Sequence, residues 1–207
     1  RNIEIFHITG GSAGDTITGA AHNDRLIGGA GEDVLSGEAG DDFLDGGADV
    51  DTLTGGAGDD ELVGGAGNDI LHGGDDNDIL YGGAGNDILN GDAGDDVLIS
   101  GRGDDTLDGG AGTDTVNYSG WFIERTDNLD GSITIKKYDR SDNLVGTDTL
   151  TNIEGFAGVT LRFVRFDGTA GNDEVVGGAG DDIMFGLAGN DTFHGGDGDD
   201  ELEGGIG

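Results

Sequence analysis

The fold is decided by a nine-residue unit, one copy of which reads Gly82-Gly83-Ala84-Gly85-Asn86-Asp87-Ile88-Leu89-Asn90. Residues 28–36 and 64–72 repeat the pattern Gly-Gly-x-Gly-x-Asp-x-U-x, in which U is apolar. The aspartate recurs without a slip at every ninth position of a first block: Asp15, Asp24, Asp33, Asp42, Asp51, Asp60, Asp69, Asp78, Asp87, Asp96, Asp105 and Asp114. It resumes in a different phase in a second block: Asp173, Asp182, Asp191 and Asp200. Two blocks of repeats therefore flank one non-repetitive insert.

Each unit combines a turn with a short strand. In the last three residues, U points to one side and its two neighbours point to the other, which predicts a minimal strand. The six glycine-rich residues before these three predict a turn. Two units then close one lap, and parallel laps lie about 4.8 Å apart. The sequence thus predicts an all-β fold, a right-handed parallel β-roll in two blocks joined by a small β insert.

The position marked U is apolar in all sixteen units and predicts a thin, continuous core along the roll. Its residues are Ile17, Leu26, Leu35, Leu44, Leu53, Leu62, Leu71, Leu80, Leu89, Leu98, Leu107, Val116, Val175, Met184, Phe193 and Leu202.

Composition shows that this core is not enough. The chain has 44 acidic and 9 basic residues, a net charge of −35, only 33% hydrophobic residues and 47 glycines, which taken alone is typical of a disordered chain. A stabiliser from outside the chain is therefore needed. Aspartates of successive laps would face each other about 4.8 Å apart, a separation that a calcium ion with oxygen ligands at about 2.3–2.6 Å can bridge.

The nonapeptide is that of the RTX (hemolysin-type) calcium-binding repeat, and the chain resembles that family over residues 10–117 and 168–207. The resemblance implies that backbone carbonyls of the glycine loop complete each ion's shell and that bound calcium orders the roll. The candidate metal ligands are the sixteen aspartates of the repeats. The gaps between laps predict about ten to twelve calcium ions.

The fourth position of the unit departs from glycine at four places: Ala13, His22, Asp49 and Asp76. Aspartate tolerates a left-handed backbone more readily than alanine or histidine does. Among the predicted calcium sites, those that touch the first two units are therefore expected to fit the ion least well, and the site at Asp15 least of all.

The sequence divides into residues 1–9, the tail of a preceding insert or an N-terminal strand; 10–117, the first block; 118–167, the insert; and 168–207, the second block. Asp130-Gly131 before 133–138 predicts a hairpin, and residues 159–163 alternate again. The segment 152–156 echoes 2–6, which indicates a piece of a longer protein. Aromatic residues predict a small insert core: Tyr118, Trp121, Phe122, Tyr138, Phe156, Phe163 and Phe166.

Motifs for catalysis have simpler explanations. Ser12 occupies the serine position of Gly-x-Ser-x-Gly but lies in a repeat loop with no buried strand before it. Adjacent acids recur with the repeat, and the four histidines lack the spacing of a zinc protease. We therefore expect no catalytic residue in this segment. Zero cysteines exclude disulfides, no membrane span is present, and the acidic surface would repel nucleic acid and anionic lipid.

An apolar strip is expected on the outer face of the sheet made by the even-numbered units: Phe43, Val63, Ile79, Tyr81, Val97 and Ile99. It reflects either β-propensity or a face for docking or self-association.

The sequence as a whole predicts a calcium-dependent structural module of a larger secreted bacterial protein, extracellular or at the cell surface, which folds on export. Its role would be a spacer in a surface protein, adhesin or surface-layer component. The alternative is a C-terminal export and folding appendage of a secreted protease, lipase, epimerase or toxin. The family's one-step (type I) export route applies to both roles.

Overall fold

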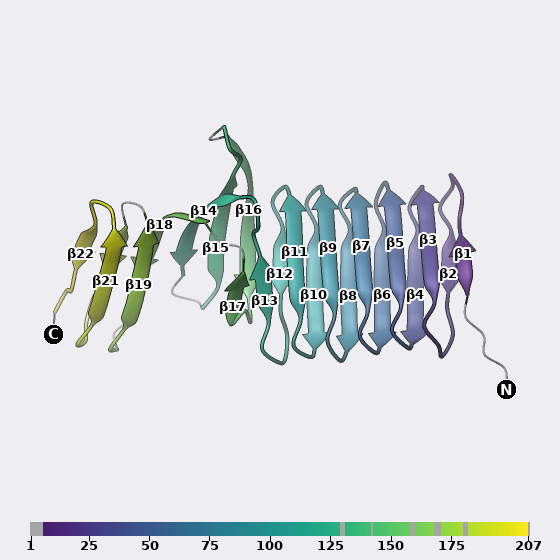
Figure 1. Ribbon diagram of the computed structural model, residues 1–207, viewed down its shortest axis with the longest axis horizontal. Helices are drawn as coiled ribbons and strands as arrows, with labels where there is room; N and C mark the ends of the chain where they lie inside the picture. Colours follow the sequence, from purple (N-terminus) through teal and green to yellow (C-terminus); the bar gives the residue numbers. More distant parts are fainter. Residues whose placement is uncertain are drawn as a thin grey trace. The chain divides into compact units, whose positions relative to one another are not determined.

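The computed structural model describes residues 6–128, 131–141, 143–157, 160–167, 171–179 and 182–206, whose regular structure is all β-strand (Figure 1). The chain forms two compact units. The first comprises Arg1–Asn117 with Thr151–Ala157, and the second comprises Tyr118–Leu150 with Gly158–Gly207.

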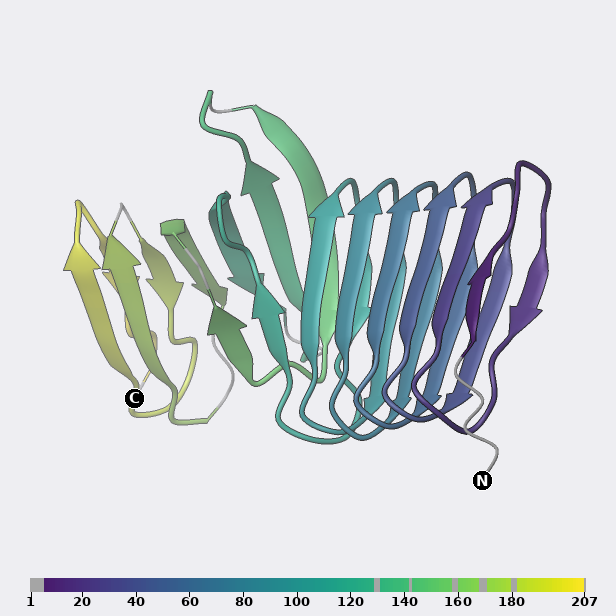
Figure 2. The same cartoon turned by 45° about the vertical axis from the view of Figure 1, so that its right-hand side comes forward.

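The first unit is a parallel β-roll, in which strands alternate between two sheets along the chain (Figure 2). One sheet has the order β1-β3-β5-β7-β9-β11-β13-β17, and the other contains β2-β4-β6-β8-β10-β12. The strands are β1 (His7–Thr9), β2 (Thr16–Thr18), β3 (Arg25–Ala30), β4 (Val34–Ala39), β5 (Phe43–Ala48), β6 (Thr52–Ala57), β7 (Glu61–Ala66), β8 (Ile70–Asp75), β9 (Ile79–Ala84), β10 (Ile88–Ala93), β11 (Val97–Arg102), β12 (Thr106–Asp108), β13 (Thr115–Asn117) and β17 (Gly155–Ala157). The predicted all-β parallel roll is confirmed.

The register follows the repeat, because equivalent residues of alternate units pair, as Leu44 does with Leu62 and Leu62 with Leu80. The strands are longer than predicted, however. Most run through the glycine pair, and Gly47 pairs with Gly65 in the same ladder. The prediction that all six glycine-rich residues only turn is therefore wrong. A Cβ on Gly65 would collide with the carbonyl oxygen of Gly47, so glycine here permits close backbone approach between laps as well as bending.

The predicted core ladder is confirmed in the first unit. Every U side chain from Leu26 to Val116 is at most 1% exposed, and Ile17 on the terminal rung is 7% exposed. In the second unit Met184 is fully buried, but Leu202 is 45% exposed. Leu202 lies on β22, the last strand of its sheet, so its side chain has a neighbouring rung on one side only.

The second unit combines the insert with the second block of repeats. Its strands β16, β15, β14, β18, β20 and β22 lie in this order in one sheet, and β19 pairs with β21 in another. The strands are β14 (Phe122–Asp127), β15 (Ile133–Tyr138), β16 (Leu144–Thr151), β18 (Thr160–Asp167), β19 (Glu174–Ala179), β20 (Ile183–Phe185), β21 (Thr192–Asp197) and β22 (Glu201–Glu203).

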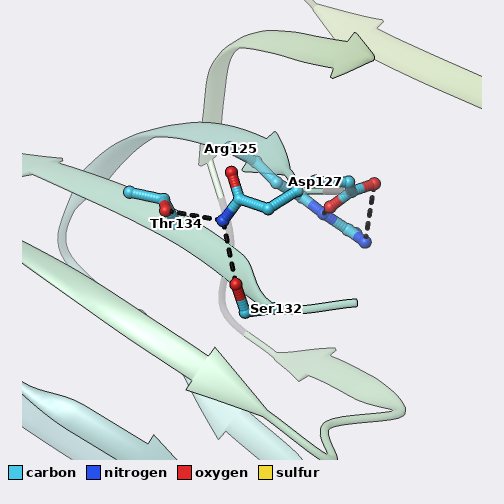
Figure 3. A network of polar contacts seen from close by, with 5 residues as sticks. Arg125, Asp127, Ser132 and Thr134 are labelled. Atoms are coloured by element: carbon cyan, nitrogen blue, oxygen red, sulfur yellow. Dashed lines mark hydrogen bonds and ion pairs between the residues drawn. The ribbon is translucent and has the colours of Figure 1, made fainter. Parts of the chain in front are cut away.

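The predicted hairpin is the antiparallel pair β14–β15, in which Thr126 faces Thr134. At its turn the side-chain amide of Asn128 donates to Ser132 Oγ at 3.1 Å and to Thr134 Oγ1 at 3.0 Å (Figure 3). Gly131 adopts a φ of 89°, which few other residues tolerate. Asp130 and Val159, which also entered the sequence-based prediction, lie outside the described residues.

The insert has a core of its own, which contains a buried ion pair. Tyr118, Ile123, Ile135 and Leu150 are at most 1% exposed, whereas Phe122 is 40% exposed. Within this core, Lys137 Nζ lies 2.7 Å from Asp148 Oδ1, and both side chains are fully buried. Tyr118 Oη donates to Asp148 Oδ2 at 2.8 Å. No local sequence pattern predicts this pair.

Candidate metal centres

The repeat aspartates of the first unit form two rows, in each of which the neighbours are eighteen residues apart, as Asp51 and Asp69 are. All of them from Asp24 to Asp114 are at most 3% exposed, and Asp15, on the first rung of its row, is half-buried. In the second unit Asp182 is 1% exposed, and the other three repeat aspartates are half-buried. The structure thus brings the predicted residues together row by row.

In most of these carboxylates, one oxygen accepts a hydrogen bond from the preceding lap. The backbone N–H of an aspartate donates to Oδ1 of the aspartate eighteen residues later, at 2.6–2.9 Å throughout the first block, from Asp15 and Asp33 to Asp96 and Asp114. The second block has the same bond from Asp173 to Asp191 at 3.0 Å and from Asp182 to Asp200 at 2.9 Å. These hydrogen bonds fix the position of the accepting carboxylates relative to the preceding lap.

The other oxygen, Oδ2, is buried in most rungs and has no hydrogen-bond partner among the described residues. This holds for Asp33, Asp42, Asp51, Asp60, Asp69, Asp78, Asp96, Asp114 and Asp191. A buried charged oxygen without a partner is costly. A cation beside each Oδ2 would remove that cost.

At the first position of the unit, the lack of a side chain lets two oxygen atoms lie close to the glycine. A Cβ placed on Gly64 would lie 2.7 Å from Asp69 Oδ2 and 2.7 Å from the carbonyl oxygen of Gly82, one lap further on. A carboxylate oxygen and a backbone carbonyl oxygen, the ligands that calcium prefers, therefore lie near each other beside Gly64. Since Oδ1 of Asp69 faces the lap before and Oδ2 the lap after, an interior aspartate can serve two ions. The residues present fit calcium.

The electrostatics of the rows also favour a cation. Burial, together with neighbouring carboxylates, raises the pKa of Asp60 and Asp78 to about 7 and that of Asp51 and Asp96 to about 6. The backbone N–H on Oδ1 opposes this rise in pKa but does not cancel it. The ionised rows are therefore unfavourable without a counter-charge.

The loop backbone explains the exceptions to the repeat. Asp49 and Asp76, which replace the fourth-position glycine, adopt φ values of 77° and 74°, whereas Ala13 and His22 do not take a positive φ. The first two loops thus depart from the others, as the sequence predicts. The structure adds a feature that the sequence analysis missed: Leu187, at the second position of its unit, also has a positive φ, 62°.

One acidic residue outside the repeats lies in line with a row. Glu154 Oε2 accepts from the backbone N–H of Asp114 at 2.9 Å, as the aspartate of a further lap would. Its sequence signal was the echo between residues 152–156 and 2–6, but that echo identified no ligand.

The other candidates are surface features. Ser12 is exposed in the turn before β2, and His72 contacts Asp92 through an exposed pair at 3.2 Å. Within the described ranges, no three His, Cys, Asp or Glu side chains gather into a metal-binding cluster. The same part of the chain contains no helix with the length and apolarity to cross a membrane.

Comparison with known proteins agrees with the geometry. The family model of the RTX calcium-binding nonapeptide repeat matches residues 7–35, 18–53, 28–62, 54–89, 81–116, 165–193 and 177–207. A search of curated proteins finds no match. Because the matched residues make up more than half of the chain, it belongs to the family of RTX calcium-binding nonapeptide-repeat proteins, whose repeats bind calcium.

Proposed function

We propose that the chain is a calcium-dependent structural module, in which the sixteen repeat aspartates hold ions between successive laps. The observation that carries this proposal is a set of buried Oδ2 atoms, those of Asp33, Asp51 and Asp69 among them, for which the described part of the chain offers no hydrogen-bond partner. Ten gaps between aspartates in the first block and two in the second correspond to about twelve ions.

In this proposal calcium concentration acts as the switch for folding. With dissociation constants of about 100 μM, typical of extracellular calcium modules, about 1 mM calcium stabilises each site by roughly 1.4 kcal/mol. Twelve independent sites would contribute about 17 kcal/mol, which exceeds the whole stability of a typical domain. Submicromolar calcium contributes almost nothing. The chain would stay unfolded inside the cell and fold after export.

Isothermal titration calorimetry tests the site assignment. We expect about twelve ions per chain, with folding coupled to their binding. A count of two or three ions would contradict the assignment of one site to each gap.

The role that we propose within the parent protein is a rigid spacer in a surface protein, adhesin or surface-layer component. Residues 10–117 and 168–207 would supply the calcium-dependent rolls, and 118–167 would connect them. The alternative is an export and folding appendage of a secreted enzyme or toxin. The full-length gene product decides: further repeat blocks with inserts favour the first role, and an upstream catalytic domain favours the second.

The apolar strip would give the spacer a contact surface. Ile79 and Tyr81 on β9 are 38% and 36% exposed, and Ile79 pairs with Val97 in the adjacent strand β11. We propose that this face supports self-association. The double variant Ile79→Thr, Val97→Thr would then weaken association in size-exclusion chromatography at unchanged calcium stoichiometry, and an unchanged elution volume would count against it.

A further inference from the structure

The segment Thr151–Ala157 extends the first roll beyond its last repeat. Its strand β17 pairs in parallel with β13, so that Gly155 faces Thr115 and Phe156 faces Val116. Phe156 therefore stands at the apolar U position of a further lap. By the same register, Glu154 stands at the aspartate position, although no nonapeptide is present there.

Two hydrogen bonds around Glu154 copy those of the repeat, although Glu154 N–H itself donates to the carbonyl oxygen of Asp114 at 3.1 Å, a bond that the repeat does not have. Asp114 N–H donates to Glu154 Oε2 at 2.9 Å, just as Asp96 N–H donates to Asp114 Oδ1 at 2.9 Å. Gly155 N–H donates to the carbonyl oxygen of Asp114 at 2.8 Å, just as Thr115 N–H donates to that of Asp96 at 2.8 Å. Glu154 thus replaces the next aspartate of the row.

The same lap also supplies a carbonyl oxygen. Gly109 N–H donates to Thr151 O at 3.1 Å, which places Asn152 where the first glycine of the next unit would be. A Cβ on Gly109 would meet both the carbonyl oxygen of Asn152 and, at 2.5 Å, Oδ2 of Asp114. The same two kinds of calcium ligand, a carboxylate oxygen and a backbone carbonyl oxygen, lie beside Gly64. Asp114 is 0% exposed, and its Oδ2 has no hydrogen-bond partner among the described residues.

We propose that Asp114, Glu154 and the carbonyl oxygen of Asn152 hold a further calcium ion, at a site that lies outside the nonapeptide repeats. This inference rests on the proposed function of the repeat rows. The carboxylate lies two positions after the carbonyl ligand here, compared with five positions in a repeat unit such as 64–69. The shorter loop offers fewer backbone oxygens, so water completes the shell and the site binds more weakly than a repeat site.

The bound ion would hold the segment that follows the insert, residues 151–157, to the last repeat of the first roll. The chain leaves the roll after Asn117 and returns at Thr151, so the ion would tie the returning segment to the open end of the roll. Because the site is weaker, this closure would occur at a higher calcium concentration than folding of the repeats.

The test is hydrogen–deuterium exchange of the full chain during a calcium titration, comparing the wild type with Glu154→Gln. Glutamine keeps an oxygen that can accept from Asp114 N–H but removes the charge. We expect the calcium concentration for half-protection of residues 151–157 to rise at least about tenfold, because calcium affinity depends on ligand charge. Protection of residues 43–102 would not change.

A matched control is Asp108→Asn, which also removes one carboxylate beside this segment. Asp108 Oδ1 accepts from the Asn152 side chain at 2.7 Å, a bond that asparagine can retain. Its half-protection concentration should stay near that of the wild type. If Glu154→Gln leaves the titration of 151–157 unchanged while the repeats still respond to calcium, Glu154 is only a hydrogen-bond acceptor and the inference fails. If the repeats of the wild type do not respond, the proposed function itself fails.

Discussion

Asp69→Asn is the most informative single substitution in the roll. Asp69 is fully buried, its Oδ1 accepts from Asp51 N–H at 2.8 Å, and its Oδ2 lies beside Gly64. Asparagine can keep the Oδ1 bond, but it places an uncharged NH₂ group where Oδ2 was. Because an interior aspartate serves the gap before it and the gap after it, the variant should lose about two ions.

The expected cost follows from the linkage between binding and folding. Two sites at roughly 1.4 kcal/mol each correspond to a loss of about 3 kcal/mol at about 1 mM calcium. The melting temperature should fall by roughly 5–10 °C. At about 0.3 mM calcium each site contributes only roughly 0.8 kcal/mol, so the difference between variant and wild type should shrink to about 1.6 kcal/mol.

The assay is thermal unfolding followed by circular dichroism at both calcium concentrations, with ion counting by calorimetry. Asp59→Asn is the matched control, because Asp59 is exposed and its Oδ1 accepts from Asn77 N–H at 3.0 Å, a bond that asparagine can retain. The reasoning is refuted if Asp69→Asn binds as many ions as the wild type, or if its destabilisation is the same at both calcium concentrations.

Three further outcomes follow from the structure. The pKa of Asp60 and Asp78 is raised from 3.8 to about 7 in the folded chain. Without metal, protonation of these two carboxylates therefore stabilises the folded chain fully below pH 3.8, and this contribution is lost as pH rises through about 7. Acidification from about pH 8 to about pH 5 should therefore increase the β-structure of the chain in chelator. In calcium the same acidification should reduce stability, because protons compete with calcium for the carboxylates. Circular dichroism in which the β-structure changes in the same direction under both conditions would contradict this. Leu71→Ala, at a fully buried core position, should lower the free energy of unfolding by about 2–5 kcal/mol in calcium, and a loss below about 1 kcal/mol would argue against a packed ladder. Lys137→Ala should lower the free energy of unfolding by about 3–5 kcal/mol, because it removes the cation that pairs with the buried Asp148. The double change Lys137→Met, Asp148→Leu should recover most of that stability in denaturant unfolding. A double variant no more stable than the single one would contradict this.

The strict repeat made most of the roll predictable. A fixed period places Leu44, Leu62 and Leu80 in one column and Asp51 and Asp69 in one row, and the structure has both. The strand lengths were missed because period-two alternation is read from side chains. A glycine pair has none, although its backbone continues the ladder.

The insert was predictable only in outline. Asp130-Gly131 pointed to a hairpin, but the Lys137–Asp148 pair depends on how separate strands pack, which no local pattern shows. Glu154 was missed for a related reason. Its place in the row depends on the register of β17 beside β13, and the segment that carries it lacks the nonapeptide pattern.

Removal of calcium tests the central claim most directly. We expect chelation of calcium to below about 1 μM to abolish the β-sheet circular dichroism and the cooperative melting of the chain, and restoration of about 1 mM calcium to recover both. If the spectrum and the melting temperature are the same in chelator and in calcium, the rows of buried aspartates do not depend on bound ions and the account is contradicted.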